Sequence, residues 1–476
     1  MYYQNKPQFP KDFLWGASSA AWQIEGAAEE EGKSLSIIDL NSRKKAPYAD
    51  SSVASDLYHH YKEDVALMKE MGFKSYRFSM AWPRIFPNGT GEPNPAGVRF
   101  YHALLDELLA AGINPIVTLY HYDLPVCLQE RYGGWANRQI IEDFDRYVRF
   151  CFREYGDKVK YWLSINEQNM QIFYGHWLGL STGVSDWERE KWNINHYMNL
   201  AHAKACIACH ELVPDGKIGP VPGMVPIYPL NCDPKNMIAA MNAELFTEKL
   251  WTDTYAHGKY PPLFLRYLRD EGITLDMQPG DEELMAAGKI DYFGINCYRS
   301  NTAMDCPPEE QAQEIVLNKS GVKGNFTYPK FPGKFQLCAN PYVETTDWDW
   351  EIDPVALRYL CRMMFDLYQL PMIITENGFG AHDKLTADEK VHDDYRIAFL
   401  RENIRQIGLA LEDGVPVLGY NLWSYCDLLS TGNGMAKRYG LVYINTTDED
   451  VLDLRRIRKD SFFWYQSVIK TNGGAL

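Results

Sequence analysis

The feature that most constrains the fold of this chain is a regular alternation of short apolar runs with longer amphipathic segments. Eight runs are rich in β-branched and aromatic residues, which favours strands over helices at these lengths: residues 13–18, 74–79, 114–120, 161–165, 217–221, 291–296, 371–375 and 417–422. Several of them are apolar almost throughout, which is typical of parallel strands that are covered on both faces.

Helical patterns occupy the intervals between these runs. Apolar residues recur at helical spacing over residues 58–71, 96–111, 138–154, 194–211, 236–257, 354–370 and 388–412. Glycine follows three of the predicted last turns, at Gly72, Gly112 and Gly414. The left-handed backbone of a helix end favours a residue without a side chain, so these glycines support the predicted ends.

Eight strand–helix units without a linker or an internal repeat predict an α/β protein, a single (β/α)8 TIM barrel over residues 1–476. Two stretches, 176–193 and 300–353, have the composition of long loops. Loops at the C-terminal ends of barrel strands usually shape the substrate site. We therefore expect both loops at that face, with simple surface insertion as the alternative.

Charge and hydropathy limit the partners of this chain. The formal net charge of −15 disfavours nucleic acid and anionic membrane surfaces as partners. No apolar run is long enough to span a bilayer, and residues 1–7 contain no apolar leader segment. We therefore predict a cytoplasmic protein without a membrane partner, and a homo-oligomer stays open.

The sequence gives little support for a metal or a cofactor. Cys206 and Cys209 form an isolated C-x-x-C inside a predicted helix, which we interpret as buried free thiols and not as a zinc site. His59 and His60 lack the spacing of a zinc-binding helix, and no glycine-rich nucleotide motif follows a strand. We expect neither a metal nor a cofactor.

Two glutamates stand where a barrel would bring catalytic groups together. Glu167 follows the run 161–165, and Glu376 follows the run 371–375. Residues at the C-terminal ends of different barrel strands converge on one mouth. Cleavage of a glycosidic bond needs two such carboxyl groups, one protonated and one ionised. For an isolated glutamate, a solvated loop carboxylate or a structural ion pair would be the simpler interpretation.

Three motifs together resemble glycoside hydrolase family 1. They are FLWGASSAAWQIEG at residues 13–26, Asn166-Glu167, and TENG at residues 375–378. The resemblance covers nearly the whole chain. It implies a retaining double displacement, with Glu376 as the nucleophile and Glu167 as the acid/base residue.

The same resemblance implies roles for neighbouring polar residues. Arg77, inside an apolar strand, and Tyr298 match family positions that contact the nucleophile, and Asn296, in the same motif as Tyr298, is expected to support the nucleophile as well. An ionised nucleophile also needs a nearby cation and a hydrogen-bond donor on chemical grounds. The family positions that hold the non-reducing sugar correspond to Gln23, His121, Asn166 and Trp423.

The chain departs from the commonest family pattern at two positions near these residues. Tyr122 follows His121 where the family usually has tryptophan, and Gln168 follows Glu167 where it usually has proline. Neither change removes a reacting group. Both put the expected sugar and aglycone contacts nearby in question.

Residues 430–439 bear on the substrate. Ordinary family 1 β-glucosidases have Glu-Trp where this chain has Ser430-Thr431, and usually phenylalanine at Tyr439. Serine removes a negative charge and adds a donor, while Lys437 supplies a cation and Tyr439 a phenolic donor. We therefore expect Ser430, Lys437 and Tyr439 to bind a 6-phosphate, and they resemble the signature of the family's 6-phospho-β-glycosidases. A polar loop with a common Lys-Arg-Tyr is the alternative.

Two further residues concern the sugar epimer and the leaving group. Thr431 resembles the small residue of phospho-glucosidases more than the tryptophan of phospho-galactosidases, so a gluco substrate is favoured and dual activity stays open. Trp350 is a candidate platform for the aglycone, with simple packing as the alternative.

The sequence therefore predicts a hydrolase whose small-molecule substrate is a 6-phospho-β-D-glucoside. An ordinary β-glucosidase or β-galactosidase acting on unphosphorylated sugar is the alternative. A non-catalytic sugar-binding barrel is a remote third hypothesis, because such proteins typically lose one carboxylate and both are present here.

Overall fold

The computed structural model describes residues 8–44 and 49–476, and its centre is a closed barrel of eight strands. Their sheet order is β5-β4-β3-β2-β1-β12-β11-β7, and every pair in this order is parallel. A parallel bridge between Gly223 and Asn296 joins the two outer strands, β5 and β7. The predicted α/β barrel is confirmed.

All eight predicted strands are present, with bounds shifted by two residues at most. They are β1 (Leu14–Ser18), β2 (Ser75–Ser79), β3 (Asn114–Tyr120), β4 (Tyr161–Asn166), β5 (Lys217–Val221), β7 (Phe293–Asn296), β11 (Met372–Glu376) and β12 (Val417–Trp423). The accuracy follows from their continuous apolar character, which few helices or loops share.

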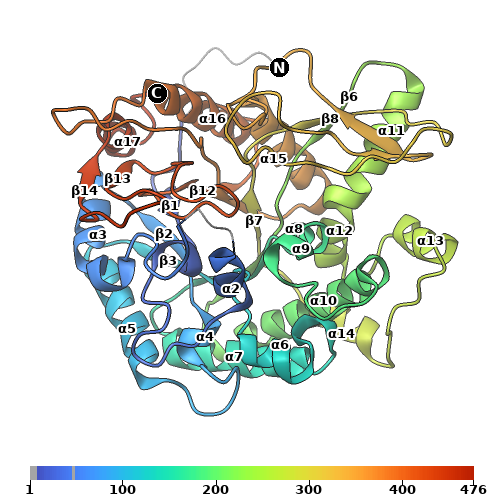
Figure 1. Cartoon of the computed structure of the whole chain (residues 1–476), viewed down its shortest axis with the longest axis horizontal. Helices are drawn as coiled ribbons and strands as arrows, with labels where there is room; N and C mark the ends of the chain where they lie inside the picture. The colour runs from blue at the N-terminus through green and yellow to red at the C-terminus, as the bar shows by residue number, and fades with distance from the viewer. Residues whose placement is uncertain (1–7, 45–48) are drawn as a thin grey trace.

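Helices surround the barrel (Figure 1). The predicted ones are α3 (Leu57–Met71), α5 (Pro95–Ala110), α7 (Ile140–Tyr155), α10 (Trp187–Leu212), α15 (Val355–Tyr368) and α16 (Asp394–Glu412), and a helical run of α11 (Pro234–Glu244), the π-helical η2 (Leu245–Lys249) and α12 (Leu250–His257). Shorter helices, most of them in the connections, are α1 (Ala21–Ile24), α2 (Ile37–Arg43), α4 (Trp82–Ile85), α6 (Val126–Tyr132), η1 (Gly134–Ala136), α8 (Gln168–Phe173), α9 (Gly175–Leu178), α13 (Pro262–Asp270), α14 (Asp281–Ala287) and α17 (Asp460–Lys470).

The two predicted loops contain regular structure, so those predictions were wrong in part. Residues 176–193 include most of α9 and the first turns of α10, which begins at Trp187. Residues 300–353 contribute β8 (Asn301–Met304), β9 (Lys330–Phe331) and β10 (Phe335–Cys338) to a second sheet, ordered β6-β8-β10-β9 with β6 (Ile227–Pro229). Strands this short carry too little periodicity to be recognised, because distant pairing defines them. Figure 1 shows β6 and β8 beside α11.

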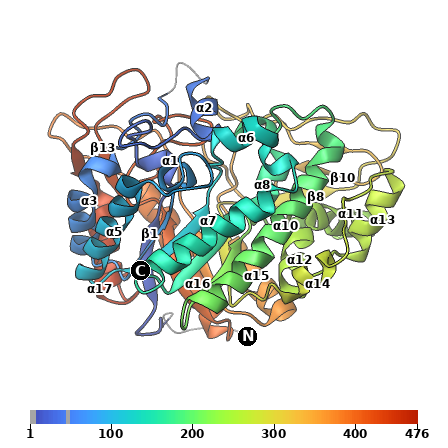
Figure 2. The ribbon, with the colours of Figure 1, turned by 90° about the horizontal axis from the view of Figure 1, so that it is seen from below.

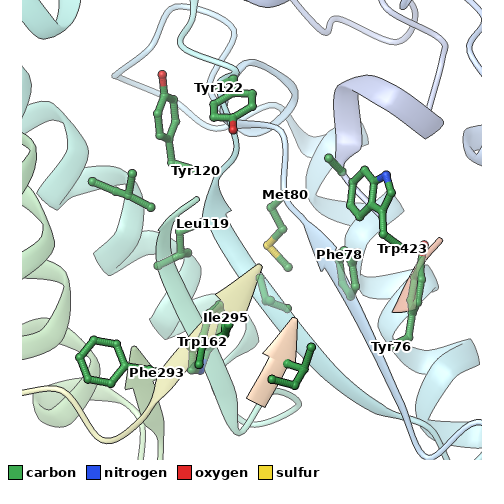
Figure 3. Close-up of a cluster of buried hydrophobic side chains, with 14 of the residues drawn as sticks. Tyr76, Phe78, Met80, Leu119, Tyr120, Tyr122, Trp162, Phe293, Ile295 and Trp423 are labelled. Atoms are coloured by element: carbon green, nitrogen blue, oxygen red, sulfur yellow. The ribbon is translucent and has the colours of Figure 1, made fainter. Parts of the chain in front are cut away.

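The barrel is filled by side chains at one end and left polar at the other. Ile116, Leu163, Val221 and Ile373, from four different strands, pack together inside it. A larger aromatic and aliphatic cluster lies between the strands and the helices, and Figure 3 shows part of it, with Trp423 near the end of its strand. Polar residues such as Asn166 and Glu376 lie at the C-terminal ends of the strands.

The connections that follow these strand ends gather on one side of the molecule. In Figure 2, α2 and α6, which follow β1 and β3, lie at the top. A small antiparallel pair, β13 (Val442–Ile444) with β14 (Arg456–Arg458), belongs to the connection after β12. Among the described residues, no helix is long and apolar enough to cross a membrane. The first seven residues, from which we predict no leader, lie outside the described part of the chain.

Candidate active site

Strand ends bring the two predicted glutamates into one hydrogen-bonded network. Glu376 is the last residue of β11, and Glu167 directly follows β4. Arg77, on β2, links the ends of β11 and β4: its Nη1 donates to Glu376 Oε1, and its Nη2 donates to Asn166 Oδ1 at 2.6 Å. Arg77 is fully buried, and a buried guanidinium needs a carboxylate partner. Glu376 is that partner.

Glu376 is buried and held at both carboxylate oxygens. The Tyr298 hydroxyl donates to Oε2 at 2.6 Å, while Arg77 occupies Oε1. Burial raises the pKa of Glu376 to about 7, and the charge of Glu167 adds to this rise. The Arg77 cation and the Tyr298 hydrogen bond oppose it. Both contacts therefore favour the ionised form that a nucleophile needs.

Glu167 also accepts a hydrogen bond at each oxygen. Asn296 Nδ2 donates to Oε1 at 3.0 Å, and the Tyr122 hydroxyl donates to Oε2. We predicted that Asn296 supports the nucleophile, but its amide contacts Glu167 and Asn166 instead. The reason is the Thr375 hydroxyl, which donates to Asn296 Oδ1 at 2.8 Å and turns the amide nitrogen away from Glu376.

The predicted sugar-binding residues line the same end of the barrel. Asn166 Nδ2 donates to His121 Nε2 at 3.2 Å, and the His121 and Trp423 rings are stacked with centroids 6.1 Å apart. Burial, with a contribution from the Arg77 charge, lowers the pKa of His121 well below its usual value, so the imidazole is neutral. Gln23, on α1, donates through Nε2 to the Leu429 carbonyl at 2.6 Å.

The segment after β12 places a buried cation beside this site. Lys437 is 2% exposed, and its Nζ lies 3.6 Å from the centre of the Trp350 ring and 5.5 Å from that of Tyr439. Within residues 8–44 and 49–476, no hydrogen bond or ion pair reaches its ammonium group. Burial, and then the charge of Arg299, lowers the pKa of Lys437 well below its usual value.

Ser430 and Tyr439 complete this group. A side-chain hydrogen bond from Ser430 lowers the pKa of Tyr439, but burial is the larger effect and raises it. Gly380 leaves room for the lysine, since a Cβ on it would lie 2.5 Å from Lys437 Cε. Ser430, Lys437 and Tyr439, which we call the anion pocket, therefore present two hydroxyls and one cation without a counter-anion.

Trp350 and Thr431 border the anion pocket in different ways. The Trp350 ring meets the Tyr298 ring edge-on at 5.6 Å between centroids as well as lying under Lys437. It therefore connects the predicted nucleophile's neighbour to the anion pocket. Thr431, directly after Ser430, is half-buried.

Sequence reasoning missed three features of this site. The first is the contact of Tyr122 with Glu167. The second is Arg299, a largely buried cation 5.8 Å from the Trp350 ring centre and 3.6 Å from the Glu351 carboxylate. Its position directly after Tyr298 was the available signal.

The third missed feature is a charge network that fixes the segment carrying the anion pocket. The Asp427 carboxylate accepts from Arg438 at 2.8 Å, from Lys459 at 2.6 Å and from the Gly440 amide at 3.0 Å. Lys459 also pairs with Asp383, beyond β11. These charges come from segments far apart in the sequence, so no local pattern reveals them.

Among the described residues, no group of three or more histidine, cysteine or acidic side chains could hold a metal ion. Cys206 and Cys209 are free and buried, as predicted. Their thiols lie inside α10.

Comparisons with known proteins identify the family of this chain. Residues 5–474 match the family described as glycosyl hydrolase family 1. The chain is 46% identical to aryl-phospho-β-D-glucosidase BglC of Bacillus subtilis, with all of both chains covered, and 41% identical to BglH of the same organism, with 99% of each covered. A family 1 β-glucosidase from Thermotoga maritima superposes with a TM-score of 0.86 at 33% identity, over 98% of this chain and 99% of that one.

This chain belongs to glycosyl hydrolase family 1, a family of retaining glycosidases. Within that family, the chain is similar over its full length to two aryl-phospho-β-D-glucosidases.

Proposed function

We propose that this protein hydrolyses 6-phospho-β-D-glucosides with retention of configuration, releasing glucose 6-phosphate and an alcohol, phenol or second sugar. The observation that carries the proposal is the buried Lys437 ammonium without a counter-anion, beside Ser430 and Tyr439. Burial makes the charged form of Lys437 costly, and an anionic ligand beside the ammonium group would offset that cost, so a phosphate fits this position.

The mechanism assigns different work to the two glutamates. In the first step Glu376 attacks the anomeric carbon while Glu167 gives its proton to the leaving oxygen. In the second step Glu167 takes a proton from water, whose oxygen bonds to the anomeric carbon as the bond to Glu376 breaks. Arg77 and Tyr298 favour the ionised nucleophile before the first step and accept its returning charge after the second.

The sugar is held by groups that differ in polarity. Asn166 would meet the 2-hydroxyl, where hydrogen bonds strengthen in the transition state. Gln23, neutral His121 and Trp423 would contact the rest of the ring, and the 6-phosphate would enter the anion pocket. Thr431 favours the gluco epimer, and Trp350 is the proposed platform for the leaving group. We place all of this in one catalytic domain of residues 1–476, working in the cytoplasm without a metal or cofactor.

The names of the relatives support this substrate class, since BglC and BglH are both described as aryl-phospho-β-D-glucosidases. A second candidate is hydrolysis of plain β-glucosides, which the likeness to the Thermotoga maritima β-glucosidase favours. A glutamate at position 430 would favour an unphosphorylated sugar as the substrate. This chain has Ser430 there, which favours the phosphorylated one.

The deciding experiment compares kcat/KM on p-nitrophenyl 6-phospho-β-D-glucoside, on its unphosphorylated parent and on the 6-phospho-galactoside. We expect a preference of more than about a hundredfold for the phosphorylated glucoside over the plain one, which corresponds to about 2.7 kcal/mol of transition-state discrimination. Preference for the plain glucoside would refute the phosphate proposal. Comparable turnover of the galactoside would show that Thr431 does not select the epimer.

A further inference from the structure

Tyr122 has an unusual backbone conformation next to the acid/base glutamate. It lies two residues beyond β3, with a φ of 72°, and is 5% exposed. Few residues with a side chain adopt this left-handed region, and such residues cluster at functional sites. Asp123 supports the turn, because its Oδ1 accepts from the His121 amide at 3.1 Å. The turn directs the Tyr122 ring towards the end of β4.

The Tyr122 hydroxyl contacts two residues of the site. It donates to Glu167 Oε2, and it lies 3.5 Å from Asn166 Nδ2, which donates to it. Burial, then the charge of Glu167, raises the pKa of Tyr122 well above its usual value. The phenol therefore keeps its proton and acts as a donor to the carboxylate.

We propose that Tyr122 is a positioning residue that acts through Glu167: its hydroxyl orients the carboxyl group and stabilises the negative charge that develops there when Glu167 gives its proton to the leaving oxygen. The inference rests on the acid/base role of Glu167 proposed above. A donor to a carboxylate stabilises the charged group over the protonated acid. It therefore assists the first step, in which Glu167 loses a proton, and does not assist the second, in which the carboxylate gains one.

A hydroxyl fits this position in a way that an indole does not. Tyr122 donates to Glu167 and accepts from Asn166 through one oxygen atom. Tryptophan, the usual family residue here, has a donor N–H and no acceptor. The tyrosine thus couples the acid/base group to the residue proposed to hold the 2-hydroxyl of the sugar.

The test compares Tyr122→Phe with a matched control, Tyr120→Phe. Tyr120 is a fully buried residue of β3 whose ring packs 5.4 Å from that of Trp135, and Figure 3 shows its hydroxyl and that of Tyr122 pointing in different directions. The substrate is a 2,4-dinitrophenyl β-glucoside, phosphorylated or plain according to which one the wild-type enzyme prefers. Its leaving group departs without a proton, so kcat/KM on it reports the first step without the acid, whereas the unsubstituted phenyl glucoside of the same sugar needs the acid.

For Tyr122→Phe we expect kcat/KM on the phenyl glucoside to fall about tenfold, while kcat/KM on the dinitrophenyl glucoside changes less than about twofold. The control variant should leave both readouts at wild-type values. Because phenylalanine removes a single oxygen atom, equal melting temperatures would verify folding in both variants.

Three outcomes separate the possible failures. An unchanged kcat/KM on the phenyl glucoside, or an equal fall on both substrates, in Tyr122→Phe would overturn the inference. Equal effects in Tyr120→Phe would also overturn it, since they would reflect packing. Finally, a Glu167→Gln variant that keeps wild-type kcat/KM on the phenyl glucoside would show that the acid/base assignment itself is wrong, a failure distinct from that of Tyr122.

Discussion

Replacing Lys437 with methionine tests the anion pocket most directly. Methionine has a similar volume and no charge, so the change removes the cation while filling the space beside Trp350 and Gly380. At an effective dielectric constant near 20, two unit charges about 4 Å apart interact by about 4 kcal/mol. Part of this is offset by the cost of removing both ions from water. Losing one partner of a buried charge pair typically costs about 2–5 kcal/mol, and we adopt about 3 kcal/mol here.

This energy predicts a substrate-specific defect. Lys437→Met should lower kcat/KM for the 6-phospho-glucoside by about 150-fold, equivalent to about 3 kcal/mol. The plain glucoside carries no anion, so its kcat/KM should change less than about threefold. Steady-state kinetics on the two p-nitrophenyl substrates at pH 7 measures both values. Equal losses on the two substrates would refute the argument, because they would mean that Lys437 holds the loop and not the phosphate.

The same variant makes an independent prediction for stability. The pKa of Lys437 lies well below its unfolded value in the folded protein, so the unfolded chain binds more protons between the two values. The free energy of unfolding should therefore rise with pH in that window, up to about 10.5. Lys437→Met should lose this rise and be at least as stable as wild type at pH 7. Urea unfolding at several pH values measures the slope, and a marked destabilisation at pH 7 would contradict the account.

Two further changes address the nucleophile and the loop. Tyr298→Phe removes a hydrogen bond that lowers the pKa of Glu376. The acidic limb of kcat/KM, expected near pH 7, should therefore move to higher pH, with about a tenfold loss of kcat/KM below that limb. A pH–rate profile measures the limb, and an unmoved limb would contradict the nucleophile assignment. Ser430→Glu places a carboxylate in the anion pocket and should weaken the phosphorylated substrate far more than the plain one. Binding of glucose 6-phosphate, compared with that of glucose and measured by calorimetry, provides a check of that variant that does not depend on turnover.

A charge network fixes the segment that carries the anion pocket. Asp427, Arg438, Lys459 and Asp383 neutralise one another, and together they tie the segment after β12 to the segment after β11. Lys437 lies next to Arg438 in the chain but makes no ion pair with this network.

The sequence alone determined the barrel, its eight strands and the two glutamates. Strands of a parallel barrel are covered on both faces, so most of their residues are apolar and their positions can be predicted from local composition. Glu167 and Glu376 follow from short motifs at strand ends, where the barrel geometry leaves little freedom. The candidate anion pocket was also within reach, because Ser430, Lys437 and Tyr439 lie within ten residues of one another.

Only the tertiary structure decided the contacts between these groups. The second sheet consists of strands of two to four residues, which exist because distant segments pair with them. Asn296 turns towards Glu167 because of Thr375 on the neighbouring strand, and Tyr122 reaches Glu167 through a left-handed turn. Hydrogen-bond partners and pKa values depend on distances across the barrel, and the sequence does not contain those distances.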